Sequence, residues 1–260
     1  MNLNIDKIRV NLVDKMKRGQ MVRIIYLGAS CTQRRIPGMH WGDWLELACK
    51  LQYGGGMFQA FSAGVGGETT KDLLNRLDRD VIKLSPDAVI MTIGGNDAIR
   101  NMPLDDYEHN LLTLYRRMSE SGVLVIFQTY YAWDLKRLPG VGDKLNKFMQ
   151  IIRDTAKKTE SPFIDQYERW SPIISQKEYV DRLLMDPLHT TELGNLVMGL
   201  NLSNIFECAN PGDLEPAEAS KVPKSDSLMA NYAKEVVRLM TSYTKEAIEI
   251  HETINSKLDI

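Results

Sequence analysis

Short runs of apolar residues alternate with longer amphipathic stretches along most of the chain. The apolar runs have the length of buried β-strands and are bounded by glycine, proline or polar residues. They lie at residues 21–27, 57–62, 88–93, 124–128 and 163–165. The stretches between them have helical periodicity and lie at 41–51, 70–84, 104–121 and 143–158. This alternation predicts a parallel sheet that is covered by helices on both faces.

The two ends of the chain have their own patterns. Apolar residues recur at helical spacing near the N-terminus, which predicts a helix within residues 1–20 ahead of a main domain over 21–209. That domain ends in a further helix over 192–205. Residues 210–225 hold three prolines and predict a linker. The linker and a long amphipathic helix over 229–254 make up a final region, 210–260, and this helix either packs on its own domain or forms a homodimer.

Composition narrows the class of protein. The chain has 260 residues with 32 Lys and Arg against 34 Asp and Glu, and it has no basic stripe, so we expect no nucleic-acid partner. No apolar run approaches the roughly 20 residues that cross a bilayer. The N-terminus lacks the pattern of a signal peptide, and three unpatterned cysteines favour a reducing compartment over a disulfide framework or a zinc site. We therefore expect a cytoplasmic protein.

Four loops carry residues that suit acyl chemistry. Ser30 follows the first predicted strand, Gly64 lies in a glycine-rich run after the second, and Asn96 follows two glycines after the third. An aspartate, Asp186, precedes His189 by three residues, a spacing that lets a carboxylate orient an imidazole ring. Each loop alone is also typical of an ordinary turn or a surface pair. Taken together, they place a nucleophile, hydrogen-bond donors and a base at one edge of a parallel sheet.

This order of residues resembles the SGNH hydrolases, also called GDSL-like esterases, over residues 22–206. The resemblance implies a three-layer α/β/α sandwich with a flavodoxin-like parallel sheet of about five strands, here with an extra C-terminal helix. It implies Ser30 as the nucleophile, His189 as the general base and Asp186 as its partner. It further implies an oxyanion hole made of the Ser30 N–H, the Gly64 N–H and the Asn96 amide. No metal and no cofactor are implied.

Two positions depart from the family pattern, and three residues compete for catalytic roles. Ala29 stands where the family usually has aspartate before the serine, and Ser62 stands where it usually has asparagine before the donor glycine. Cys31 is intrinsically a better nucleophile than serine once it is ionised, but the fourfold match requires Ser30. His109 and His251 lie in predicted helices, and we expect both on the surface.

Aromatic residues and one further histidine are candidates for the substrate pocket. Tyr130, Tyr131 and Trp133 follow the fourth predicted strand and would rise from the edge of the sheet that carries the site. His40 follows the nucleophile segment closely and is placed at the pocket rim. Packing in the core is the alternative role for the aromatic residues.

The resemblance favours the hypothesis that the protein is a serine esterase. Such an enzyme would hydrolyse short-chain carboxylic esters, with O-acetyl groups on carbohydrates as one substrate class. No long insertion that could form a lid separates the four loops, which favours short acyl groups. A lysophospholipase or thioesterase is the main alternative. An acyltransferase and a non-catalytic binding protein of the same fold stay open. The expected partner is a small-molecule or saccharide ester.

Overall fold

The computed structural model describes residues 3–36, 38–209 and 227–258. Among these residues, one sheet of five parallel strands forms the centre of the protein. The strands are β1 (Val22–Gly28), β2 (Phe58–Gly64), β3 (Ala88–Thr92), β4 (Leu124–Gln128) and β5 (Phe163–Ile164). The strands other than β2 are almost fully buried, as expected for a parallel sheet with helices on both faces.

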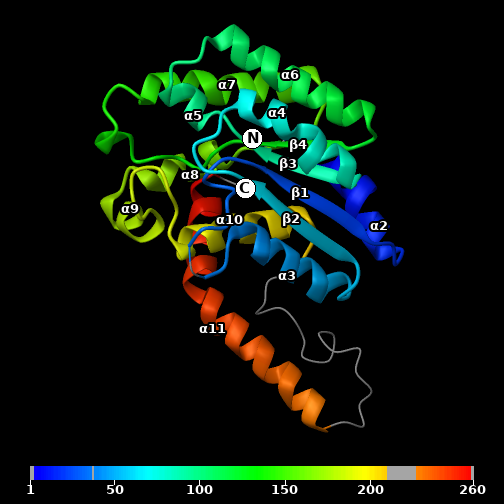
Figure 1. Ribbon diagram of the computed structural model, residues 1–260. Helices are drawn as coiled ribbons and strands as arrows, with labels where there is room; N and C mark the ends of the chain where they lie inside the picture. The colour runs from blue at the N-terminus through cyan, green and yellow to red at the C-terminus, as the bar shows by residue number, and fades with distance from the viewer. Residues whose placement is uncertain (1–2, 37, 210–226, 259–260) are drawn as a thin grey trace.

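The strand order is β2-β1-β3-β4-β5, the flavodoxin-like order that the family resemblance implied. The connection through α3 (Trp41–Tyr53) runs on one face of the sheet, where α10 (Glu192–Ile205) packs beside it. The connections through α4 (Thr70–Asp80), α6 (Leu104–Glu120) and α7 (Gly142–Lys158) cover the opposite face (Figure 1). The predicted three-layer α/β/α fold is therefore confirmed.

Several shorter helices complete the described part of the main body. They are η2 (Ile82–Leu84), α5 (Gly95–Ile99), η3 (Leu135–Arg137), α8 (Gln166–Ile174) and α9 (Lys177–Leu183). The sequence analysis did not identify α5, α8 or α9. These helices have nine residues or fewer, which is too short for a clear helical period. The region of α8 and α9 matters for the site because it leads directly into the loop that carries His189.

The N-terminal segment is helical, as the sequence predicted, but it is not one uniform helix. It consists of α1 (Asp6–Ile8), a π-helical turn η1 (Arg9–Val13) and α2 (Asp14–Lys17). Four of its apolar residues are buried in the same hydrophobic core as the sheet, namely Ile8, Leu12, Val13 and Met16, whereas Val10 is exposed. Leu3 also pairs with Phe163 of β5 in an antiparallel bridge.

The long C-terminal helix is α11 (Ser227–Lys257), and its second half packs against α8 and α10 while its first half runs away from the body (Figure 1). Ala247, Ile250 and Ile254 are buried there. The linker predicted over 210–225 lies outside the described residues. No helix among the described residues has both the length and the apolar character that a bilayer crossing requires.

The expectation that His251 lies on the surface is wrong. Its ring is 5% exposed, and its Nδ1 accepts a hydrogen bond from the Arg169 guanidinium of α8 at 2.7 Å. Arg169 also donates to Asn201 of α10 and Asn255 of α11. This polar cluster ties α11 to the body, and the helical period alone could not show which polar residue faces it. His109 is exposed, as expected.

Candidate active site

The candidate site lies at the carboxyl ends of β1 and β3, where the chain connections diverge to the two sides of the sheet. Such a switch point is where open α/β sheets form ligand sites, because the loops on either side separate there. Ser30 comes two residues after β1, and Asn96 lies in α5 directly after β3. His189 reaches the same place from the loop between α9 and α10.

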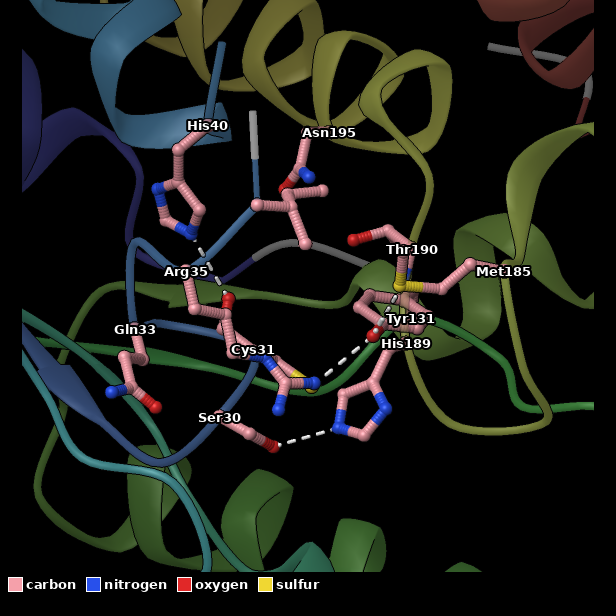
Figure 2. Close-up of a pocket in the computed structure, with 11 residues that line it drawn as sticks. Ser30, Cys31, Gln33, Arg35, His40, Tyr131, Met185, His189, Thr190 and Asn195 are labelled. Atoms are coloured by element: carbon pink, nitrogen blue, oxygen red, sulfur yellow. Dashed lines mark hydrogen bonds between the residues drawn. The ribbon is translucent and has the colours of Figure 1, made fainter. Parts of the chain in front are cut away.

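Ser30, His189 and Asp186 form a hydrogen-bonded chain. The Ser30 Oγ lies 3.0 Å from the His189 Nε2 (Figure 2). The His189 Nδ1 lies 2.7 Å from the Asp186 Oδ2. With its proton on Nδ1, the imidazole donates to the carboxylate and accepts from the serine hydroxyl. This is the tautomer that a general base needs in order to take a proton from serine.

The Asp186 carboxylate is fixed in place by its own loop. Its Oδ1 accepts backbone hydrogen bonds from Leu188 at 2.7 Å and from His189 at 2.9 Å. Burial by itself would raise the pKa of Asp186, but these donors and the His189 ring together hold the pKa below its usual value. The carboxylate therefore stays ionised and keeps its acceptor turned towards the ring.

Tyr131 holds the histidine loop against the sheet. Its hydroxyl donates to the Leu188 carbonyl at 2.6 Å and accepts from the Thr190 N–H at 3.2 Å, so it bridges the residues on both sides of His189. The side chain is 1% exposed. Tyr131 lines the narrow part of the cavity, as predicted for the pocket, but its contacts make it a support for the loop.

The structure does not bring Gly64 to the cavity. The sequence analysis ended the second strand at residue 62, but β2 continues to Gly64, which pairs with Gly28 of β1. A Cβ atom at Gly64 would meet the backbone of Thr32 and Gln33 at 2.2–2.7 Å, so this glycine serves close packing of two chain segments. The interpretation of Gly64 as an oxyanion donor is corrected accordingly.

Two later glycines of the same loop do line the cavity beside Ser30. They are Gly66 and Gly67, and Gly67 has a backbone φ of +82°, in the left-handed region that favours glycine. Asn96 lines the same cavity, and its Nδ2 donates to the Glu68 carbonyl at 2.8 Å. That bond uses one of the two amide hydrogens and leaves the second for a ligand.

The cavity beside Ser30 has a volume of about 240 Å³, and a narrow extension of about 20 Å³ shares Ser30, Arg35 and His189 with its lining. Tyr130 and Trp133 form an aromatic wall of the larger part, in agreement with the pocket prediction. The extension has room for about one water-sized group. The site therefore suits a small ligand, since pockets for drug-sized molecules typically exceed 300 Å³.

His40 lines the narrow extension, but both of its ring nitrogens form hydrogen bonds with backbone groups of the protein. Its Nδ1 accepts from the Gly42 N–H at the start of α3, and its Nε2 donates to the Cys31 carbonyl at 3.1 Å. Burial lowers the pKa of His40, which keeps the ring neutral. His40 is therefore a helix cap that also supports the nucleophile loop.

The two departures from the family pattern have different local consequences. Ala29 is 1% exposed and its methyl group packs in the core, while its carbonyl accepts from the N–H groups of Thr32 and Gln33. The Ser62 hydroxyl donates to the Thr32 carbonyl at 2.7 Å, so it joins β2 to the nucleophile loop. Asp97 accepts from the N–H and hydroxyl of Thr70 and so fixes the start of α4 to the Asn96 loop.

Cys31 is placed poorly for nucleophilic attack. Its Sγ lies 3.1 Å from the Tyr131 hydroxyl and 3.8 Å from the Leu188 carbonyl, and its hydrogen bonds in the described structure do not include His189. Burial raises the pKa of this thiol to about 11, so the thiolate is scarce at neutral pH. The geometry favours Ser30 over Cys31.

The comparison with known proteins agrees with this geometry. Residues 26–197 match the GDSL-like lipase/acylhydrolase family, which is more than half of the chain. An acetylxylan esterase of Geobacillus stearothermophilus is 25% identical in an alignment of length 145 residues, which covers 52% of this chain and 66% of that enzyme. The matched part is thus just under two thirds of the relative's length.

Solved structures show the same fold. The crystal structure of that Geobacillus acetylxylan esterase gives a TM-score of 0.64 at 20% identity and covers 72% of this chain and 95% of the enzyme. A second acetyl xylan esterase, AlAXEase, gives 0.63 at 20% identity with 72% and 98% covered. Three variants of the Geobacillus enzyme, with a serine, an aspartate or a histidine changed to alanine, are described as catalytic mutants.

The fold and the match define the class: the chain belongs to the GDSL-like lipase/acylhydrolase family, a class of carboxylic ester hydrolases. The resemblance to SGNH hydrolases drawn from the sequence is therefore confirmed.

Proposed function

We propose that this protein is a serine esterase that removes short acyl groups, acetyl foremost, from a small-molecule or saccharide ester. The observation that carries the proposal is the chain of contacts from the Ser30 hydroxyl through His189 to Asp186, with lengths of 3.0 and 2.7 Å. A serine hydroxyl is a weak nucleophile, and it needs an adjacent base of fixed tautomer. The three side chains supply that base and its orientation.

In this mechanism the Ser30 Oγ attacks the ester carbonyl while His189 Nε2 takes its proton. The imidazolium that forms is stabilised by the ionised Asp186, and it then gives the proton to the departing alcohol. Water enters next, His189 takes a proton from it, and the hydroxide attacks the acyl-serine. Collapse of this second tetrahedral intermediate releases the acid and returns the proton to Ser30.

The tetrahedral intermediate carries a negative oxygen that needs hydrogen-bond donors. We assign the Ser30 N–H, the Gly67 N–H and the Asn96 amide to this role, with Gly67 in place of Gly64. Gly67 and Asn96 support the assignment because both line the cavity that Ser30 faces. Removal of one such donor typically lowers kcat about 10²- to 10³-fold.

Two observations favour a small acyl group. The cavity of about 240 Å³ and its extension of about 20 Å³ have little room for a long alkyl chain. The relatives named above are esterases of acetylated xylan, a polysaccharide, which supports O-acetyl groups on carbohydrates as the substrate class. A lysophospholipase or thioesterase would need an acyl channel, and the described cavity favours the acetylesterase.

The test is hydrolysis of 4-nitrophenyl esters from acetate to palmitate by the parent, Ser30→Ala and His189→Ala. We expect turnover of acetate that falls steeply with chain length and is lost by several orders of magnitude in both variants. His109→Ala is the matched control, since this histidine is exposed on α6. Activity that survives in Ser30→Ala would refute the proposal, and a maximum at long chains would refute the short-acyl part.

Two further predictions from the sequence belong to this proposal. A cytoplasmic location is checked by fractionation of the native host. A homodimer through the C-terminal helix is checked by light scattering on the full chain and on Leu239→Glu, because Leu239 is 52% exposed on α11. A monomer in both samples would refute the dimer.

A further inference from the structure

One cation at the candidate site has no hydrogen-bond or ion-pair partner in the part of the chain that the structure describes. Arg35 lines both the larger cavity and its narrow extension, and its exposed side chain is directed towards the Ser30–His189 pair (Figure 2). Among the described residues, no hydrogen bond or ion pair engages its guanidinium. The preceding residue differs, because Arg34 Nε lies 3.1 Å from an Asp43 carboxylate oxygen. Within the described ranges, Arg35 is therefore an unpaired charge at the cleft.

The surroundings of Arg35 offer no competing carboxylate. Neither part of the cavity is lined by an aspartate or glutamate among the described residues. The nearby acids are engaged elsewhere: Asp186 with His189, Asp43 with Arg34, and Glu192 with the Met39 N–H and the Tyr243 hydroxyl. An incoming anion would thus meet one unpaired cation with no carboxylate on the cavity wall to repel it.

An isolated arginine on an open surface is ordinary, so its position decides the argument. A guanidinium presents a planar fork of donors that matches the oxygens of a carboxylate, phosphate or sulfate group. Beside the nucleophile, such a contact would form as the substrate displaces water from the cleft, which strengthens it. The positive charge also attracts anionic substrates from solution.

We propose that Arg35 is a specificity-determining residue that binds an anionic group of the ester substrate next to the scissile bond. This proposal rests on the proposed esterase function of Ser30. The anionic group belongs to the alcohol half or to the acyl half of the ester, for example a uronate-type carboxylate on the sugar or a dicarboxylic acyl group. The shared chemistry is an ester with a carboxylate or a similar oxyanion nearby.

The first test uses pairs of substrates of nearly equal size in which a charged carboxylate is exchanged for a neutral carboxamide. For the alcohol half, 4-acetoxybenzoate is compared with its neutral amide, 4-acetoxybenzamide. For the acyl half, 4-nitrophenyl hemisuccinate is compared with 4-nitrophenyl succinamate. We expect the parent to prefer the charged member of one pair, and that pair identifies the half of the substrate that Arg35 contacts.

Substitutions then assign the preference to one residue. Arg35→Gln should lower kcat/KM for the charged member about tenfold, a typical effect of losing one charge-assisted contact, and leave the neutral member within about twofold. Arg35→Lys should keep most of the preference. Arg34→Gln, which removes the same charge one residue away, should behave like the parent. Equal loss on both members in Arg35→Gln, or no preference in the parent, would overturn the proposal.

A binding measurement separates this proposal from the esterase function. Ser30→Ala protein is titrated with the preferred charged substrate and its neutral partner in a calorimeter, with and without the added Arg35→Gln change. Tighter binding of the charged compound that disappears in the double variant supports the contact even if no ester is turned over. Equal affinity for both compounds in Ser30→Ala would refute it, whereas hydrolysis by Ser30→Ala would refute the proposed function instead.

Discussion

The exchange Asp186→Asn tests how the histidine tautomer is set, because it changes charge and hydrogen bonding with almost no change in shape. The present Oδ1 accepts two backbone N–H groups, at 2.7 and 2.9 Å, and Oδ2 accepts from His189 Nδ1 at 2.7 Å. An asparagine has only one acceptor oxygen. If the asparagine oxygen keeps the two backbone bonds, the NH₂ group of the same side chain faces His189 Nδ1. The ring nitrogen Nδ1 must then give up its proton.

This arrangement places the ring proton on Nε2, where it faces the Ser30 hydroxyl and blocks proton transfer. The opposite amide orientation would set an NH₂ group against two backbone donors, so the inactive tautomer is favoured. The equivalent change in serine proteases lowers kcat about 10⁴-fold. Asp186 is 44% exposed, so water can partly replace the lost acceptor, and we expect about 10³-fold, which is about 4 kcal/mol of transition-state stabilisation.

The assay is steady-state hydrolysis of 4-nitrophenyl acetate, with thermal unfolding measured in parallel. Asp181→Asn is the matched control, because this aspartate is exposed on α9 and makes no contact with the three catalytic residues. KM should change little, since the lost interaction acts in the transition state. Retention of more than a tenth of the parent kcat in Asp186→Asn would refute the tautomer argument.

Three further outcomes follow from the structure. Asn96→Ala should lower kcat about 10²- to 10³-fold while the Ser30 acyl-enzyme still forms slowly, and an unchanged kcat would remove Asn96 from the oxyanion hole. Burial, and then the charge of Arg169, lower the pKa of His251 to about 3, below the roughly 6.5 of an unfolded chain. The unfolded state therefore binds more protons between about pH 3 and 6.5. As the pH is lowered through that window the free energy of unfolding decreases, by about 2 kcal/mol at pH 5. His251→Gln should show a smaller fall of melting temperature between pH 7 and pH 5 than the parent, and an equal fall would contradict this. With a pKa of about 11, Cys31 should resist iodoacetamide at pH 8 in the folded protein, and rapid alkylation of Cys31, read by mass spectrometry, would show a different environment.

The strands and the main helices follow from local pattern, and so does part of the site. A run such as residues 88–91 is apolar throughout because both faces of a central parallel strand are buried, and this signal is readable without the fold. The spacing of Asp186 and His189 is equally local, since a three-residue separation lets the carboxylate reach the ring within one loop. These features depend on neighbours in sequence.

The choice between Gly64 and Gly67 depends on contacts that sequence alone does not display. Two additional residues of strand pairing carry Gly64 into the sheet, because the backbone of β2 continues to match β1 up to Gly28. The loop then begins later, and its final glycine reaches the cavity. The later Gly66-Gly67 pair stood in the same run, directly before a helix start, and it is the signal that could have indicated a donor beyond the strand.

The sequence by itself therefore indicated the alternation of strands and helices through its periodicity. The resemblance of four short loop motifs indicated the family and the residues that we propose for the catalytic chain. Only the tertiary structure decided that His189 lies 3.0 Å from Ser30 across 159 positions of chain. It also decided that Arg34 pairs with Asp43, whereas Arg35 has no such partner among the described residues. Only it showed that His251 is buried against Arg169. The physical reason is that burial and charge pairing are set by whichever distant segments the folded chain brings into contact.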